Sequence, residues 1–147
     1  MSRRISHAIE IEASPAAVWT TLTDLGSFPA WNPFILKIDG ELRTGARLAV
    51  TIQPSGHRAS TFRPTVLAVE PERELRWLGR FLIPGLFDGE HSFRLEGIPR
   101  GTRLTQAERF SGILVWLSRR ALDSTRSGFQ RMNEALKARA EQVQAVG

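Results

Sequence analysis

The sequence contains no cysteine and no tyrosine, and only two of its 20 basic residues are lysines. The absence of cysteine excludes disulfide bonds, thiol catalysis and thiolate metal sites. No stretch approaches the roughly 18–20 consecutive apolar residues that a membrane-spanning helix requires. The basic pair Arg3 and Arg4 has no apolar segment behind it that would make it a signal peptide. We therefore expect a cytoplasmic protein with no integral membrane segment.

Chemical motifs are also sparse. The three histidines lie far apart, at no spacing typical of metal ligands, and no glycine-rich phosphate loop is present, so we expect neither a metal nor a cofactor. The net charge of +5 comes from arginines spread along the chain, which does not favour a nucleic-acid partner. With 147 residues, 41% hydrophobic and 24% charged, the chain is predicted to form one domain over residues 1–147.

The order of predicted elements defines a fold class. Alternation predicts a strand over residues 4–13, and Ser14-Pro15 then favours the start of a helix. A second short helical or turn segment over 24–28 is predicted to be ended by Pro29 and Pro33. A long amphipathic helix is predicted over about 113–145, where Gly128 allows close approach to the sheet. Six further strands are predicted between the helical segments, near 34–40, 46–53, 58–69, 74–81, 86–97 and 101–110.

Strands joined by short turns predict an antiparallel meander. The sequence therefore indicates an α+β fold in which a curved antiparallel sheet of about seven strands wraps around one long C-terminal helix. Two short helices follow the first strand. Such a sheet need not fill its interior, so a small chain can hold an apolar cavity between the sheet and the helix.

Two hairpins predict which residues face that interior. A four-residue loop at 98–101 pairs His91 with Glu108, Phe93 with Gln106 and Leu95 with Leu104. A four-residue loop at 70–73 pairs Ala68 with Leu75, Val66 with Trp77 and Phe62 with Phe81, with a bulge or an edge expected at Pro64. The resulting set of candidate ligand-binding residues is Phe62, Trp77, Phe81, His91, Phe93, Gln106, Glu108, Phe110, Phe129 and Met132.

His91 and Glu108 are the chemically most distinctive pair of this set. A buried carboxylate without a partner costs several kcal/mol, so Glu108 requires His91, a water or a ligand. The pair is therefore a candidate acid–base pair for catalysis, a candidate ligand-orienting pair, or a structural hydrogen bond.

Two apolar segments are candidates for the rim of the cavity. Residues 81–87 include five apolar side chains, more than a hairpin turn needs. In one interpretation this loop is a lip of the cavity that admits apolar ligands or touches a donor membrane. In the other it packs beneath the long helix or forms a contact in a homodimer. Residues 31–34, beginning with Trp31, are predicted to form the opposite lip and add Trp31 to the ligand-binding candidates.

Four segments together resemble a known superfamily. They are residues 9–19 (IEIEASPAAVW), 28–34 (FPAWNPF), 71–77 (PERELRW) and 102–112 (TRLTQAERFSG). Along nearly its whole length the chain is similar to the SRPBCC or START-related helix-grip superfamily, which includes polyketide cyclases/dehydrases, START lipid-transfer domains and the birch-pollen-allergen fold. This resemblance implies an apolar pocket between the sheet and the C-terminal helix, but it designates no catalytic position.

Three functions follow from these observations. The first is binding or transport of a small hydrophobic molecule, such as a lipid, a polyketide or an isoprenoid-like compound, in the internal cavity. The second is a cyclase or dehydratase that uses His91 and Glu108 as an acid–base pair. The third is an interaction module that presents its apolar loops to a protein partner.

Overall fold

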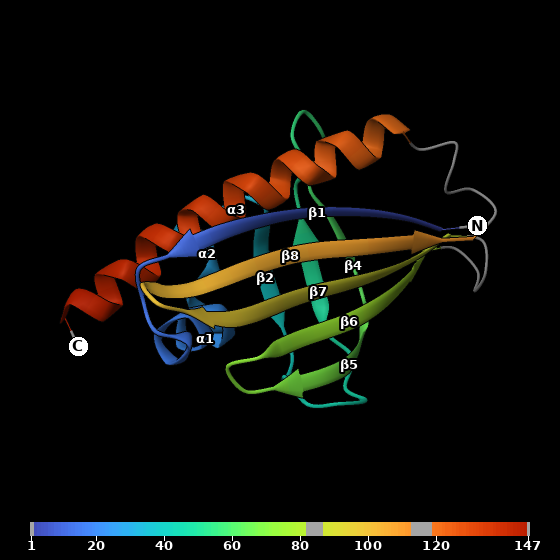
Figure 1. Cartoon of the computed structure of the whole chain (residues 1–147). Helices are drawn as coiled ribbons and strands as arrows, with labels where there is room; N and C mark the ends of the chain where they lie inside the picture. Colours follow the sequence, from blue (N-terminus) through green and yellow to red (C-terminus); the bar gives the residue numbers. More distant parts are fainter. Residues whose placement is uncertain (1, 82–86, 113–118, 147) are drawn as a thin grey trace.

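The computed structural model describes residues 2–81, 87–112 and 119–146, and it confirms the predicted α+β class. One sheet has five antiparallel strands and a second has three, while a long helix lies across the larger sheet (Figure 1). In spatial order the larger sheet contains β1 (Ser2–Ile11), β8 (Gly101–Ser111), β7 (Phe87–Ile98), β6 (Glu74–Phe81) and β5 (Thr65–Glu70). The smaller contains β2 (Ile35–Asp39), β3 (Ala49–Ile52) and β4 (Ser60–Phe62), and the long helix is α3 (Arg119–Val146).

Two short helices follow β1, as predicted. The helix α1 (Pro15–Thr23) begins at Ser14, whose hydroxyl accepts a hydrogen bond from the Ala17 N–H at 3.2 Å. A 3₁₀ turn over Leu25–Ser27 leads into α2 (Phe28–Trp31). Pro29 lies in the first turn of α2 and does not end the helical segment, because a residue there needs no N–H donor. The expected stop at Pro29 is therefore wrong, whereas the helix does end before Pro33, as predicted.

The predicted register of β7 and β8 is confirmed. His91 lies opposite Glu108, and Phe93 lies opposite Gln106. The turn is shorter than expected, since Ile98 pairs with Gly101 and the four-residue loop reduces to a two-residue turn. The additional pair extends both strands by one residue without shifting their register, so the same side chains face the interior as predicted.

The predicted register of β5 and β6 is only partly confirmed. Val66 lies opposite Trp77, but Leu75 lies opposite Val69 and not opposite Ala68. The loop after Glu70 has three residues, and Glu72 takes a left-handed conformation there with φ of 64°. A register shift between Val66 and Ala68 compensates for the shorter loop, which is why the pairing at Trp77 is still correct.

The single strand predicted over 58–69 is two strands. The chain leaves the small sheet after Phe62, which lies opposite Val50 of β3 and not opposite Phe81. It enters the large sheet at Thr65, so Pro64 marks a break between sheets rather than a bulge. The two sheets remain linked here, since the Leu48 N–H donates to the Pro64 carbonyl at 2.9 Å. This break raises the number of strands over the described residues from the predicted seven to eight.

The helix α3 closes the open side of the large sheet and packs against β1 and α1 (Figure 1). Gly128 allows the expected close approach, because a Cβ at this position would lie 2.3 Å from the ring of Phe34. The part of the predicted helix over 113–118 lies outside the described residues. The buried face of α3 consists of Leu122, Gly128, Phe129, Met132, Asn133, Leu136 and Ala140.

The opposite face of the large sheet is charged, as the register predicts. Arg76 donates to Glu90 at 2.7 Å, and this hydrogen bond holds the pKa of Arg76 above its ordinary value. None of the helices over the described residues has the length and apolarity needed to cross a bilayer.

Candidate functional site

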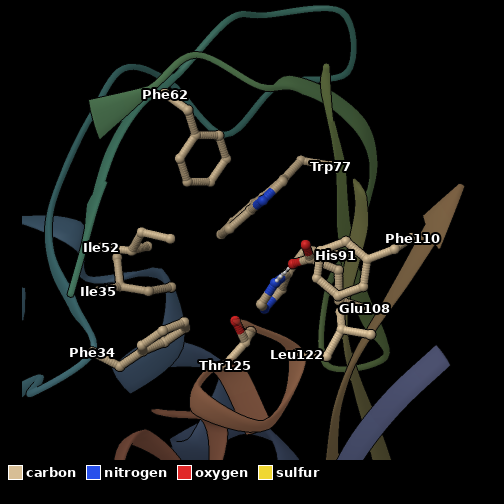
Figure 2. A pocket seen from close by; sticks show the side chains of 10 residues that line it. All are labelled: Phe34, Ile35, Ile52, Phe62, Trp77, His91, Glu108, Phe110, Leu122 and Thr125. Atoms are coloured by element: carbon tan, nitrogen blue, oxygen red, sulfur yellow. Dashed lines mark hydrogen bonds and ion pairs between the residues drawn. The ribbon is translucent and has the colours of Figure 1, made fainter. Parts of the chain in front are cut away.

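A cavity of about 150 Å³ lies between the two sheets and α3. Figure 2 shows that side chains from the large sheet, the small sheet and the helix point towards this cavity. Most of the walls are apolar, and aromatic rings form much of them. The described residues that line the cavity are Phe34, Ile35, Ile52, Phe62, Trp77, His91, Glu108, Phe110, Leu122 and Thr125.

The structure brings five of the sequence-predicted residues to the cavity wall: Phe62, Trp77, His91, Glu108 and Phe110. They come from β4, β6, β7 and β8. Although β4 belongs to the other sheet, Phe62 still reaches the cavity, because the small sheet folds over the inner face of the large one (Figure 2).

Other predicted residues are placed behind the wall. Phe93 and Phe129 are buried and contact the His91 ring, with centroid distances of 4.7 Å and 5.1 Å. Gln106 and Met132 are fully buried and do not line the cavity.

Trp31, the predicted lip residue, is partly buried but is not part of the lining. Its indole N–H donates to the Ser27 hydroxyl at 3.0 Å, and its ring packs edge-on against Phe28. The side chain of Phe81 and the loop over 82–86 lie outside the described residues. Their role as a lip or an interface stays a prediction.

Half of the lining was not among the ligand-binding candidates: Phe34, Ile35, Ile52, Leu122 and Thr125. Of these, Phe34 lies in the segment 31–34 that was predicted as a lip of the cavity. Three of them come from β2, β3 or the residue before β2, whose position over the cavity depends on how the small sheet packs. The length of a hairpin loop predicts the register of the two strands that it joins and nothing about other strands. The two predicted hairpins therefore gave no information on these residues. Leu122 and Thr125 were visible as part of the apolar stripe of the long helix.

His91 is held rigidly beside the cavity. Its Nδ1 lies 2.6 Å from Oε1 of Glu108, and its Nε2 lies 2.9 Å from Oε1 of Gln106. The imidazole also stacks on Trp77 at a centroid distance of 5.1 Å, and only 4% of the residue is exposed. Both ring nitrogens are therefore engaged by protein groups.

The hydrogen bonds behind His91 continue to the other side of the core, and their directions can be derived. The amide nitrogen of Asn133 lies 3.0 Å from the backbone carbonyl of His7, which can only accept. The Asn133 amide oxygen therefore faces Gln106, and it accepts from the Gln106 amide nitrogen at 2.8 Å. As a result, the Gln106 oxygen is the atom that faces Nε2 of His91.

This order fixes one proton of the imidazole. An amide oxygen can only accept, so Nε2 of His91 carries a proton and donates to Gln106. One further proton is shared between Nδ1 and Glu108. The pair is either an imidazolium and a carboxylate, or a neutral imidazole and a carboxylic acid, and it is neutral overall in both forms.

The same bonds settle the state of His7, which shares the inner face of β1. Its Nδ1 lies 2.9 Å from the Asn133 amide nitrogen and therefore accepts from it. His7 thus has a hydrogen-bond partner in the network, and it does not line the cavity.

Glu108 is the member of the pair that presents an ionisable oxygen to the cavity (Figure 2). The carboxyl group fits because position 89 has no side chain: a Cβ there would lie 2.6 Å from Oε2 of Glu108. Over the described residues, no group of three histidine, aspartate or glutamate side chains is arranged to hold a metal ion. The site can therefore offer a carboxyl oxygen and a shared proton to a molecule in an apolar space.

Comparison with known families assigns the chain. Residues 2–141 match the family described as polyketide cyclase/dehydrase and lipid transport. The chain belongs to this family. The match covers nearly the whole sequence and includes every described residue of the cavity wall, which confirms the resemblance that the four segments indicated. No functionally curated protein matches the sequence.

Solved structures with the same fold have low sequence identity. A START superfamily protein from Mycobacterium smegmatis aligns with a TM-score of 0.75 at 17% identity, covering 95% of this chain and 98% of that one. The protein Ara h 8.0201 aligns with a TM-score of 0.73 at 14% identity, over 97% and 99% of the two chains. The di-domain ARO/CYC protein BexL, from the BE-7585A biosynthetic pathway, aligns with a TM-score of 0.67 at 12% identity. The alignment covers 97% of this chain and 50% of the BexL chain.

Proposed function

We propose that this family member binds a small hydrophobic molecule in the cavity between the two sheets and α3. The observation that carries the proposal is the composition of the wall, in which seven of the ten described lining residues are apolar or aromatic and three, His91, Glu108 and Thr125, are polar. Apolar walls with a few convergent polar groups are typical of small-molecule sites. The family description, which includes lipid transport, supports the same class of ligand.

The volume of the cavity limits the size of the proposed ligand. Drug-sized sites have volumes of roughly 300–1,000 Å³, whereas this cavity measures about 150 Å³. A dry cavity of about 150 Å³ lined by leucine, isoleucine and phenylalanine binds benzene. We therefore propose that the cavity receives one ring or a short branched chain, and not an entire fatty acyl chain.

Thermal unfolding with and without ethylbenzene tests the proposal. A ligand that binds only the folded state raises Tm as its concentration exceeds Kd. We expect ethylbenzene to raise Tm of the wild type, and Thr125→Phe to abolish this rise because the new ring occupies the cavity. Gln130→Phe, on the exposed side of the same helix, is the matched control and should respond like the wild type. A wild-type Tm unaffected by ethylbenzene would contradict the proposal.

A second candidate function rests on the 2.6 Å contact between His91 and Glu108. A carboxylate that shares a proton with an imidazole can remove a proton from the carbon next to a carbonyl group, the first step of an aldol cyclisation or a dehydration. In this candidate Glu108 is the general base that touches the substrate. His91 is the positioning residue, because both its nitrogens already have protein partners.

Deuterium exchange tests this candidate without knowledge of the natural substrate. In D₂O, the wild-type protein should accelerate replacement of the methyl protons of acetophenone by deuterium, measured by proton NMR. Glu108→Gln should remove the acceleration while ethylbenzene still raises its Tm. No acceleration by the wild type would overturn the enzymatic candidate and leave the binding proposal standing.

A further inference from the structure

One buried donor in the cavity wall has no hydrogen-bond partner among the residues that the structure describes. The indole nitrogen Nε1 of Trp77 is buried and finds no hydrogen-bond acceptor among the described residues. The whole residue is 1% exposed, so bulk water does not hydrate this N–H group. A buried donor without an acceptor is unfavourable, and such groups are rare in folded proteins.

The position of the indole links this donor to the ligand. Trp77 lines the cavity, and Figure 2 shows its ring reaching inward between Phe62 and His91. The imidazole of His91 stacks on the indole at an interplanar angle of 20°, and both of its nitrogens already have hydrogen-bond partners. Rotation of His91 towards Nε1 would break two buried hydrogen bonds, so His91 does not supply the acceptor.

We propose that the ligand carries an acceptor oxygen, a carbonyl or an ether, that takes the hydrogen bond of Trp77 Nε1–H while its apolar ring fills the cavity. This inference rests on the proposed function, and it selects ketones and related oxygenated rings over pure hydrocarbons of the same shape. Trp77 is then the residue that determines specificity. A site built to donate one hydrogen bond discriminates against an analogue that lacks the acceptor, because its donor would stay unpaired.

Acetophenone and α-methylstyrene form a matched pair of probes, because they have nearly the same shape and differ in a carbonyl oxygen against a methylene group. The Kd of each is measured by NMR titration and corrected for its transfer from water to hydrocarbon. The corrected preference of the wild type for acetophenone should fall about 5- to 10-fold in Trp77→Phe, the worth of one such hydrogen bond. Trp19→Phe, the same change at a residue outside the cavity wall, should keep the wild-type preference.

A second measurement needs no change at Trp77. The chain has four tryptophans, so the ¹H–¹⁵N spectrum contains four indole signals, and Trp19→Phe, Trp31→Phe and Trp116→Phe assign them by elimination. Acetophenone should shift the Trp77 indole proton downfield, and α-methylstyrene should not. Equal shifts with both probes, or an unchanged preference in Trp77→Phe, would overturn this inference alone. Failure of both probes to bind the wild type would overturn the proposed function as well.

Discussion

Replacing Glu108 tests the hydrogen-bond directions derived for the core. Nε2 of His91 must donate to Gln106, so a neutral His91 has a bare Nδ1 that needs a donor. In Glu108→Gln the new amide N–H can supply this donor, and the network stays satisfied. In Glu108→Leu nothing replaces it, and the imidazole nitrogen is left buried without a partner.

The magnitudes follow from burial and bond type. His91 is 4% exposed, so an unpartnered Nδ1 costs the desolvation of that atom, about 1–3 kcal/mol. Glu108→Gln exchanges a charge-assisted hydrogen bond for a neutral one, a loss of about 1 kcal/mol. Urea denaturation at pH 7 should therefore give a larger loss of unfolding free energy for Glu108→Leu, by about 1–2 kcal/mol.

The tautomer of His91 provides the decisive readout. In Glu108→Gln, a long-range ¹H–¹⁵N correlation spectrum should find His91 neutral, with its proton on Nε2. A proton on Nδ1 and a bare Nε2 would refute the derived directions, since Gln106 would then have to donate to His91. A loss of stability in Glu108→Gln equal to that in Glu108→Leu would refute the argument from burial.

Three further predictions use the same contacts. Gly128→Ala should lower the free energy of unfolding by about 1–2 kcal/mol in thermal unfolding, because the clash with Phe34 outweighs the gain of about 1 kcal/mol in helix propensity. Adding Phe34→Leu should restore most of the lost stability, whereas a Gly128→Ala variant more stable than the wild type would contradict the clash. Gly89→Ala should displace the Glu108 carboxyl group, change the His91 nitrogen shifts and lower Tm, because the hydrogen bond to Nδ1 is disturbed. Unchanged shifts and an unchanged Tm would argue against the close packing. Hydrogen bonds from Lys137 and the Glu12 N–H lower the pKa of Glu141 from its ordinary 4.5. The stability advantage of the wild type over Glu141→Gln should therefore be complete above that pH and disappear as pH falls through the lower folded-state pKa. An advantage that grows on acidification would contradict this prediction.

Local sequence signals predicted much of this fold, because they report the strongest local constraints. The register of β7 and β8 depends only on a tight turn and alternation, so it placed His91 opposite Glu108 correctly. The register of β5 and β6 depends on a three-residue loop in which Glu72 takes a left-handed conformation. This conformation is rare for glutamate, so nothing in the sequence indicated the shorter loop.

The remaining errors concern how the chain passes between layers. The segment around Pro64 was predicted as one strand because the register of the 70–73 hairpin was extended through Pro64 as far as Phe62. Only the packing of the small sheet over the large one places Phe34, Ile35 and Ile52 at the cavity. The partnership of Gln106 with Asn133 was equally hidden, since their side chains meet across the core from β8 and α3.

The most direct test of the central claim is an isotope-filtered NOE experiment on wild-type protein saturated with ethylbenzene. We predict NOEs from the ligand protons to the methyl groups of Ile35, Ile52 and Leu122, which face the cavity from three different elements. NOEs confined to other methyl groups, or none at all in a sample where the ligand is bound, would contradict the account of this cavity as the binding site.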